Sequence, residues 1–231
     1  MERYSLNDVA VVMYHLHIPL PDPMTNPSTL ARAESLKVLV TPSYAIDGNI
    51  ASGGGSREES VPYYTRLNSQ IEERLVAPAE ARILLDAFQA NGKVNTKVTV
   101  DRISGNSSEL RLQIALIEDE LSYSGQNNLR FHPMTVRSLG GEGHLGFVID
   151  PSKKTTVEHS FDLDKITEEL KAHLDNIEKE REITFIQKKH EMDKRNLSVV
   201  AFVQDMESRN VLQSAFIKVR PDSDSNSVNG Y

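Results

Sequence analysis

Hydrophobic and polar positions follow two different periods along the chain, and the change of period divides it into two parts. Up to about residue 78, the spacing indicates helices and a few apolar runs separated by a proline-rich connector. From residue 79 onward, short segments alternate between apolar and polar residues and are separated by turn residues. We therefore expect one domain over residues 1–78 and a second over residues 79–221.

The first part is predicted to mix strands and helices. A helix at residues 60–75 is indicated by apolar residues that recur at spacings of three and four, namely Tyr64, Leu67, Ile71 and Leu75. The other expected elements are a buried strand at residues 9–17, a proline-rich connector at 18–27, a helix at 28–36 capped by Ser28, a strand at 37–40 and a hairpin at 44–50. Asp47 and Gly48 mark the hairpin turn, because glycine adopts positive φ freely.

The second part is predicted to be an antiparallel β-sandwich. Its candidate strands are residues 83–88, 94–100, 110–117, 131–139, 144–149, 155–161, 198–204 and 211–219. A densely charged helix at 164–194 interrupts this series, and Ile166, Leu170 and Leu174 give it one apolar face to lay on the sandwich. Residues 222–231 are rich in Ser, Asn and Asp and are expected to form a disordered tail. The fold class is therefore α+β.

Composition limits the classes of function. The formal net charge is −7 and there is no run of basic residues, which argues against a nucleic-acid partner. No apolar run approaches the roughly 20 residues that a membrane-spanning helix needs. The first residues lack the basic and apolar regions of a signal peptide. The chain has no cysteine, so disulfides, thiolate metal sites and cysteine catalysis by this chain are excluded.

No set of residues forms a recognisable catalytic or cofactor motif. His15 and His17 share a face of the expected first strand and could bind a metal, but no third ligand is placed to join them, so we interpret them as structural. The acidic run 118–120 could bind Ca²⁺, although a solvated turn is the favoured interpretation. His132 and Arg137 fit either a polar site or decoration of a strand, and the glycine-rich segment around His144 fits a hairpin turn. We expect no metal, no cofactor and no enzymatic activity.

Several short stretches resemble one known family. They are the run from Arg32 to Leu36, the run from Val40 to Gly48, and the segments 115–123, 131–137, 199–205 and 211–215. In this order they are similar to thioredoxin-like outer-membrane and periplasmic lipoproteins, which carry a β-sandwich after a thioredoxin fold. The resemblance implies that residues 1–78 form the second half of a thioredoxin fold. The charged helix 164–194 departs from the family pattern, and the family's Cys-x-x-Cys is absent from this chain.

The resemblance also implies a site. The Thr41–Pro42 bond would be the family's cis-proline step, where a peptide can add to the sheet edge. The implied binding residues are Val40, Thr41 and Pro42. The resemblance further implies export to the periplasm or cell envelope, with the true N-terminus and the first half of the fold missing before Met1. The apolar edge left open by that loss would be covered by dimerisation or by docking on the sandwich.

Three hypotheses of function follow from these patterns. The leading one is a non-catalytic envelope protein that binds a protein or peptide partner, a second copy of the chain being one alternative, or that serves in surface assembly. The second is a fragment of a thiol–disulfide oxidoreductase whose Cys-x-x-Cys segment is missing; the reading frame upstream of Met1 would decide this. The third is a carbohydrate-binding sandwich, which the absence of Trp and the aromatic content of 6% disfavour.

Overall fold

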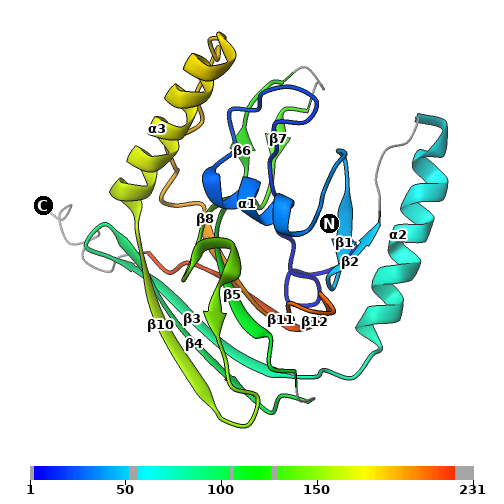
Figure 1. Ribbon diagram of the computed structural model, residues 1–231. Coiled ribbons are helices and arrows are strands. Elements are labelled where there is room, and N and C mark those ends of the chain that lie inside the picture. The colour runs from blue at the N-terminus through cyan, green and yellow to red at the C-terminus, as the bar shows by residue number, and fades with distance from the viewer. Residues whose placement is uncertain (1–2, 52–56, 105–106, 126–128, 222–231) are drawn as a thin grey trace, which may run out of the picture.

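Two antiparallel β-sheets form the centre of the molecule in the computed structural model (Figure 1), which describes residues 3–51, 57–104, 107–125 and 129–221. One sheet has the strand order β10-β4-β3, and the other has the order β12-β11-β5-β8 with the short strand β9 also beside β5. Their strands are β3 (Arg82–Ala90), β4 (Lys93–Asp101), β5 (Leu110–Glu118), β8 (Thr135–Leu139), β9 (Phe147–Val148), β10 (Thr155–Asp162), β11 (Leu197–Asp205) and β12 (Val211–Lys218). Three helices and two short hairpins complete an α+β fold, as the sequence predicts.

The two sheets enclose a hydrophobic core. On β4, Val94, Val98 and Val100 are fully buried, and Thr96 shares their face with its hydroxyl donating to the His159 carbonyl at 2.9 Å. The facing sheet contributes fully buried side chains from β5 and β11, namely Leu112, Ile114, Leu116, Val199, Ala201 and Val203. The period-two alternation of the sequence therefore selects the inner face of each strand. The predicted strands of the sandwich are confirmed to within a few residues, except that residues 131–139 divide into β7 and β8 and only Phe147–Val148 of residues 144–149 pairs as a strand.

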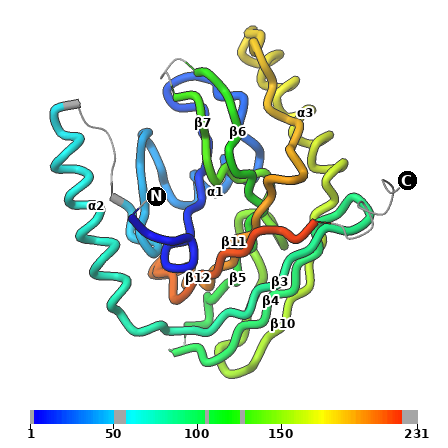
Figure 2. Tube along the Cα trace, turned by 180° about the vertical axis from the view of Figure 1, so that it is seen from behind, coloured from blue at the N-terminus to red at the C-terminus, as the bar shows by residue number. Residues whose placement is uncertain are grey.

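The outer face of the five-stranded sheet is also apolar, and the N-terminal segment covers it. Residues of the segment 6–14 pack there against Ala115, Ile117, Val136, Val200 and Phe202. Figure 2, which views the molecule from behind, shows this segment running over the sheet. The predicted strand at residues 9–17 is wrong, because only Met13 pairs with a strand, as an isolated bridge. Its N–H donates to the Met134 carbonyl at 2.8 Å and its carbonyl accepts from Val136 N–H at 3.0 Å. An apolar run can be buried by lying across a sheet face as well as by joining the sheet.

Helix α3 (Leu163–Arg181) is inserted between β10 and β11, as predicted, but it ends thirteen residues before residue 194. Asp162 caps its start by accepting from Lys165 N–H at 3.1 Å, and Glu182 ends it in the left-handed conformation at φ 52°. Its buried apolar face consists of Leu163, Ile166, Leu170, Leu174 and Ile177. The segment after the helix folds back because Arg137 binds the carbonyls of Lys189, His190 and Glu191, which then accept from a side chain rather than from a helical turn.

The elements before β3 are α1 (Pro27–Ser35), the hairpin of β1 (Tyr44–Ile46) and β2 (Asn49–Ala51), a 3₁₀ turn η1 (Arg57–Glu59) and α2 (Ser60–Leu75). The hairpin and α2 confirm their predictions. The strand predicted at residues 37–40 is not formed. Helix α1 starts one residue before the predicted Ser28, and its cap is Asn26.

Two smaller elements extend the sandwich. The short strands β6 (Leu121–Ser122) and β7 (Phe131–His132) pair as a hairpin, and η2 (Gly143–Leu145) joins β8 to β9. None of the helices in the described residues has the length and apolar character needed to span a membrane. The division into domains 1–78 and 79–221 stays a prediction, and the predicted disordered tail at 222–231 lies outside the described residues.

Candidate functional site

The sequence-predicted site lies between α1 and β1, on an exposed segment at residues 38–43 that we call the cis-proline segment. Thr41–Pro42 is a cis peptide bond. Leu39 is 83% exposed and Val40 is 47% exposed. No group in the described residues accepts a hydrogen bond from the backbone N–H of Leu39, Val40 or Thr41. The three predicted residues are thus brought together on a surface that presents both apolar side chains and available backbone donors.

The open edge of β1 continues this surface. Strand β1 pairs with β2 from Tyr44↔Ala51 to Ile46↔Asn49, and no other strand in the described part of the chain pairs with it. An edge strand leaves alternate N–H and C=O groups available for a further strand. The cis-proline segment leads directly into this edge.

Exposed apolar side chains are concentrated in this region. Seven of the fifteen exposed large hydrophobic side chains among the described residues lie between positions 39 and 76: Leu39, Val40, Ile50, Val61, Tyr64, Leu75 and Val76. Tyr64 and Leu75 belong to the apolar positions that predict α2, but they are 57% and 44% exposed. Only Asn68 is buried on this helix, so α2 (Figure 1, right) offers much of its apolar stripe to solvent.

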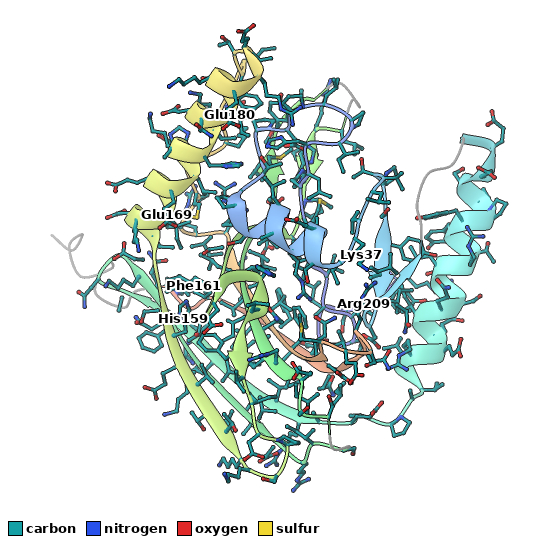
Figure 3. The ribbon with its side chains drawn as sticks, viewed as in Figure 1. Lys37, His159, Phe161, Glu169, Glu180 and Arg209 are labelled. Carbon is teal, nitrogen blue, oxygen red and sulfur yellow. The ribbon has the colours of Figure 1, made fainter. Side chains whose placement is uncertain are left out.

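The hairpin that follows the cis-proline segment is fixed to the sandwich at its turn. Asp47 and Gly48 both have positive φ, 45° and 83°. The Asp47 carbonyl accepts from Val211 N–H at 3.0 Å, and its carboxylate accepts from Arg74 Nε of α2 at 2.7 Å. Arg209 lies beside this hairpin (Figure 3) and packs directly against its turn. A Cβ on Gly48 would lie 1.7 Å from the carbonyl oxygen of Arg209.

Helix α2 is held beside the hairpin by Tyr44. Its ring makes an edge-to-face contact with Tyr63 at a centroid distance of 5.3 Å, and its hydroxyl donates to Gln70 Oε1 at 3.0 Å. Together with the Arg74–Asp47 pair, these contacts fix the hairpin against α2. The cis-proline segment therefore leads into a hairpin whose position is fixed.

Two hydroxyls shape the cis-proline segment. The Ser43 hydroxyl donates to the Val40 carbonyl at 2.7 Å. The Thr41 hydroxyl donates to the Ile18 carbonyl at 2.6 Å, which ties the segment to the proline-rich connector 18–27. Sequence reasoning could not find this second contact, because a threonine next to a proline gives no sign of its acceptor.

The two N-terminal histidines lie at a junction that the sequence did not reveal. His15 contacts His132 of β7 at a ring-centroid distance of 5.1 Å, and His17 stacks on His173 of α3 at 5.8 Å. No group of three or more His, Cys, Asp or Glu side chains in the described residues could hold a metal ion. The interpretation of His15 and His17 as structural residues stays a prediction.

The other polar candidates are structural contacts. The solvated-turn interpretation of the acidic run is wrong for Glu118, which is 5% exposed and lies 3.3 Å from Arg137 Nε. Burial raises the pKa of Glu118, and the Arg137 guanidinium opposes that shift. Strand decoration is also wrong for Arg137 and His132, because both side chains are buried. His144 lies in the 3₁₀ turn η2 rather than in a tight hairpin turn.

Comparison with known proteins finds likeness among solved structures only. No protein-family model and no curated protein matches the chain. Among solved structures, the chain is similar to a domain of the outer membrane lipoprotein Omp28 from Porphyromonas gingivalis, with 17% sequence identity and a TM-score of 0.37. The alignment covers 64% of this chain and 94% of that domain. A likeness at this level carries no argument about activity or partner, and the thioredoxin-like resemblance stays a prediction.

Proposed function

We propose that this chain is a non-catalytic protein-binding module of the cell envelope, which captures an extended segment of a partner protein along the cis-proline segment. The single observation that carries the proposal is the combination of free backbone donors at Leu39, Val40 and Thr41 with the exposed Leu39 side chain. Main-chain pairing with an added strand supplies affinity, and pockets for alternate side chains supply specificity. The envelope location follows from the family resemblance of the sequence.

Two features support capture of an extended peptide rather than a helix. The cis-proline segment leads into the open edge of β1, so a peptide strand added to that edge would reach the free donors and exposed side chains of this segment. The Asp47–Gly48 turn and α2 hold this edge in place, and a pre-formed edge lowers the ordering cost of binding. The partner segment is expected to carry apolar side chains opposite Leu39 and Val40, because these are the exposed apolar side chains of the cis-proline segment.

Selection of random linear peptides on the full-length chain, followed by affinity measurement on variants, tests the proposal. Leu39→Lys removes an apolar contact and should weaken the selected peptides by about tenfold to a hundredfold. Ile186→Lys is the matched control, since Ile186 is 99% exposed against 83% for Leu39 but lies in the segment after α3. Equal affinities for wild type and Leu39→Lys would show that the peptides bind elsewhere.

Methylated peptides test the pairing itself. Neighbouring N–H groups of a strand point in opposite directions, so only every second one can bond to a given edge. N-methylation at one position of a selected peptide should abolish binding, whereas methylation of the next residue should leave it nearly unchanged. The same loss at both positions would rule out strand addition.

A further inference from the structure

Four of the seven histidines gather where three separate parts of the chain meet. His15 and His17 come from the N-terminal segment, His132 comes from β7 and His173 comes from α3. Thr25, which is 1% exposed, lies at the centre, with its hydroxyl oxygen 3.0 Å from His17 Nε2 and 3.3 Å from His173 Nε2. We call these four histidines, Asp22 and Thr25 the histidine junction. It joins residues that are 148 positions apart in the sequence.

Hydrogen bonds fix the protonation state of His17 in this arrangement. The backbone N–H of Asp22 donates to His17 Nδ1 at 3.1 Å, so Nδ1 carries no proton. The Thr25 hydroxyl donates to the Asp22 carbonyl at 3.0 Å, which uses its only hydrogen. Its oxygen therefore accepts from His17 Nε2 and from His173 Nε2. His17 is therefore neutral with its proton on Nε2, and His173 also carries a proton on Nε2.

Protonation of His17 is incompatible with its hydrogen bond from the Asp22 N–H. A proton on His17 Nδ1 would face the Asp22 N–H, which would place two donors against each other. The stacked rings of His17 and His173 would also both be positive at a centroid distance of 5.8 Å. The closed junction therefore requires a neutral His17 and disfavours positive charge on both stacked rings.

Charges on every adjoining element contribute to this balance. Asp22, whose carboxylate lies 2.8 Å from His15 Nδ1, favours protonation of His17, whereas Arg181 of α3 opposes it. Glu180 of α3, labelled in Figure 3, favours protonation of His173. On the β6–β7 hairpin, His132 faces His15, and its Nε2 lies 3.1 Å from the carbonyl of Tyr123.

Burial outweighs the two carboxylates. It lowers the pKa of His17, and the neighbouring His173 lowers it further. Burial also lowers the pKa of His173. Both groups therefore bind fewer protons in the closed junction than in an open one, where the pKa returns toward the ordinary value of about 6.5. As the pH falls below that value, the open junction gains stability relative to the closed one.

The junction is connected to the cis-proline segment through one residue. Ile18 follows His17 directly, and its carbonyl accepts from the Thr41 hydroxyl at 2.6 Å. The position of this carbonyl depends on the backbone that His17, Asp22 and Thr25 hold in place. Opening the junction would therefore withdraw a hydrogen bond from the middle of the proposed binding site.

We propose that the histidine junction is a pH-sensitive latch, in which protonation of His17 and His173 releases the proline-rich connector from α3 and frees Thr41. The latch itself stands on the junction's geometry; its effect on partner binding rests on the proposed function. In an acidifying environment, the latch would change the conformation of the cis-proline segment without unfolding the sandwich. The latch opens at pH values below the ordinary histidine pKa of about 6.5.

Amide hydrogen exchange of the full-length chain, followed by NMR, tests the latch without any partner. Between about pH 7.5 and about pH 5.5, the protection factor of the Asp22 amide, corrected for intrinsic exchange, should fall by roughly tenfold. Amides in β5 and β11 should keep their protection. The double variant His17→Asn with His173→Gln keeps an acceptor and a donor in similar places but does not titrate, so its Asp22 protection should not change with pH. His144→Gln, outside the junction, should behave as wild type.

Three outcomes would overturn the proposal: constant protection of Asp22 in the wild-type chain, the same loss in the double variant, or a loss that includes β5 and β11. Peptide affinity measured at the same two pH values then separates the two proposals. A pH-dependent junction with no peptide binding at either pH would refute the proposed function and leave the latch standing. Peptide binding with a pH-independent junction would refute the latch alone.

Discussion

Gly48 has a backbone conformation and a close contact that only glycine satisfies together. Its φ is 83°, and the site of a Cβ lies 1.7 Å from the Arg209 carbonyl oxygen. The first property favours glycine in any hairpin turn, and the second arises because this turn packs against the loop between β11 and β12. The sequence predicts the turn but not the contact.

Gly48→Ala should therefore cost more than a positive-φ glycine usually costs. Gly143→Ala is the matched control, because Gly143 has φ 60° and open space around its Cβ site. We expect the control to lose about 1–2 kcal/mol of unfolding free energy from the strained conformation alone. Gly48→Ala should lose more than that, and it should lower the hydrogen-exchange protection of Val211, whose N–H bonds to Asp47. Equal losses in chemical denaturation would show that the turn does not depend on this contact.

At the scale of elements, the start of α1 shows what a local pattern misses. Ser28 is a reasonable cap by composition, but Asn26 performs this role by accepting from Thr29 N–H at 3.0 Å. Thr29 returns the contact by accepting from Asn26 N–H at 3.2 Å, and Asn26 Nδ2 also donates to the Val136 carbonyl of β8 at 2.9 Å. The cap thus joins α1 to β8, the edge strand of the five-stranded sheet, which no sequence spacing could indicate.

Asn26→Ala should destabilise the chain by about 1–2 kcal/mol, since it removes the cap and leaves the buried Val136 carbonyl without this donor. Thermal or urea unfolding measures the change. Ser28→Ala is the control and should leave the unfolding midpoint nearly unchanged. If the two substitutions have the same effect, the helix begins where the sequence predicts and not at Asn26.

The elements that the sequence predicts well are those fixed by their own side chains. β4 and α2 match their predicted ranges closely, because alternation in the first and the three–four spacing in the second depend on neighbouring residues. The hairpin turn at Asp47 and Gly48 is a local property of the same kind.

The elements predicted wrongly depend on distant partners. Val9 to Met13 form an apolar run that fits a buried strand, but the outer face of β5 and β11 binds it as a covering segment. The helix predicted to residue 194 stops at Arg181, and the segment beyond it is held by Arg137, which lies on β8. The stacking of His17 on His173 has no local signal at all. For the candidate site, the sequence therefore predicts the residues but not their link to the histidine junction.

At the scale of the whole molecule, the five-stranded sheet carries apolar side chains on both faces. Leu116 of β5 belongs to the core between the sheets, whereas the next residue, Ile117, belongs to the cluster beneath the N-terminal segment. Before position 79, the only core hydrophobic side chains among the described residues, apart from Pro23, are Met24 and Ala33. The first part of the chain thus relies on the sandwich for most of its burial.

We therefore expect the N-terminal part and the sandwich to unfold together, although the sequence suggests two domains. Leu116→Ala and Ile117→Ala are a matched pair, because both side chains are fully buried neighbours on one strand. Each should cost about 2–5 kcal/mol, and each should shift a single transition rather than one of two. Denaturation is followed at the amides of Met13, for the N-terminal segment, and of Val98, for the three-stranded sheet.

Two independently folding domains would give a different result. If residues 1–78 fold as a separate domain, Ile117→Ala would release the Met13 amide at low denaturant while the Val98 amide kept its protection, and Leu116→Ala would not. Coincident transitions at both amides in both variants would instead show that the covering segment is part of one cooperative unit. In that case the same folded body holds the cis-proline segment at its middle, where Thr41 bonds to Ile18, and beyond its end, at the Asp47 turn. A partner that binds there would then stabilise the whole chain by mass action, and the sandwich would serve as the rigid support of the binding surface.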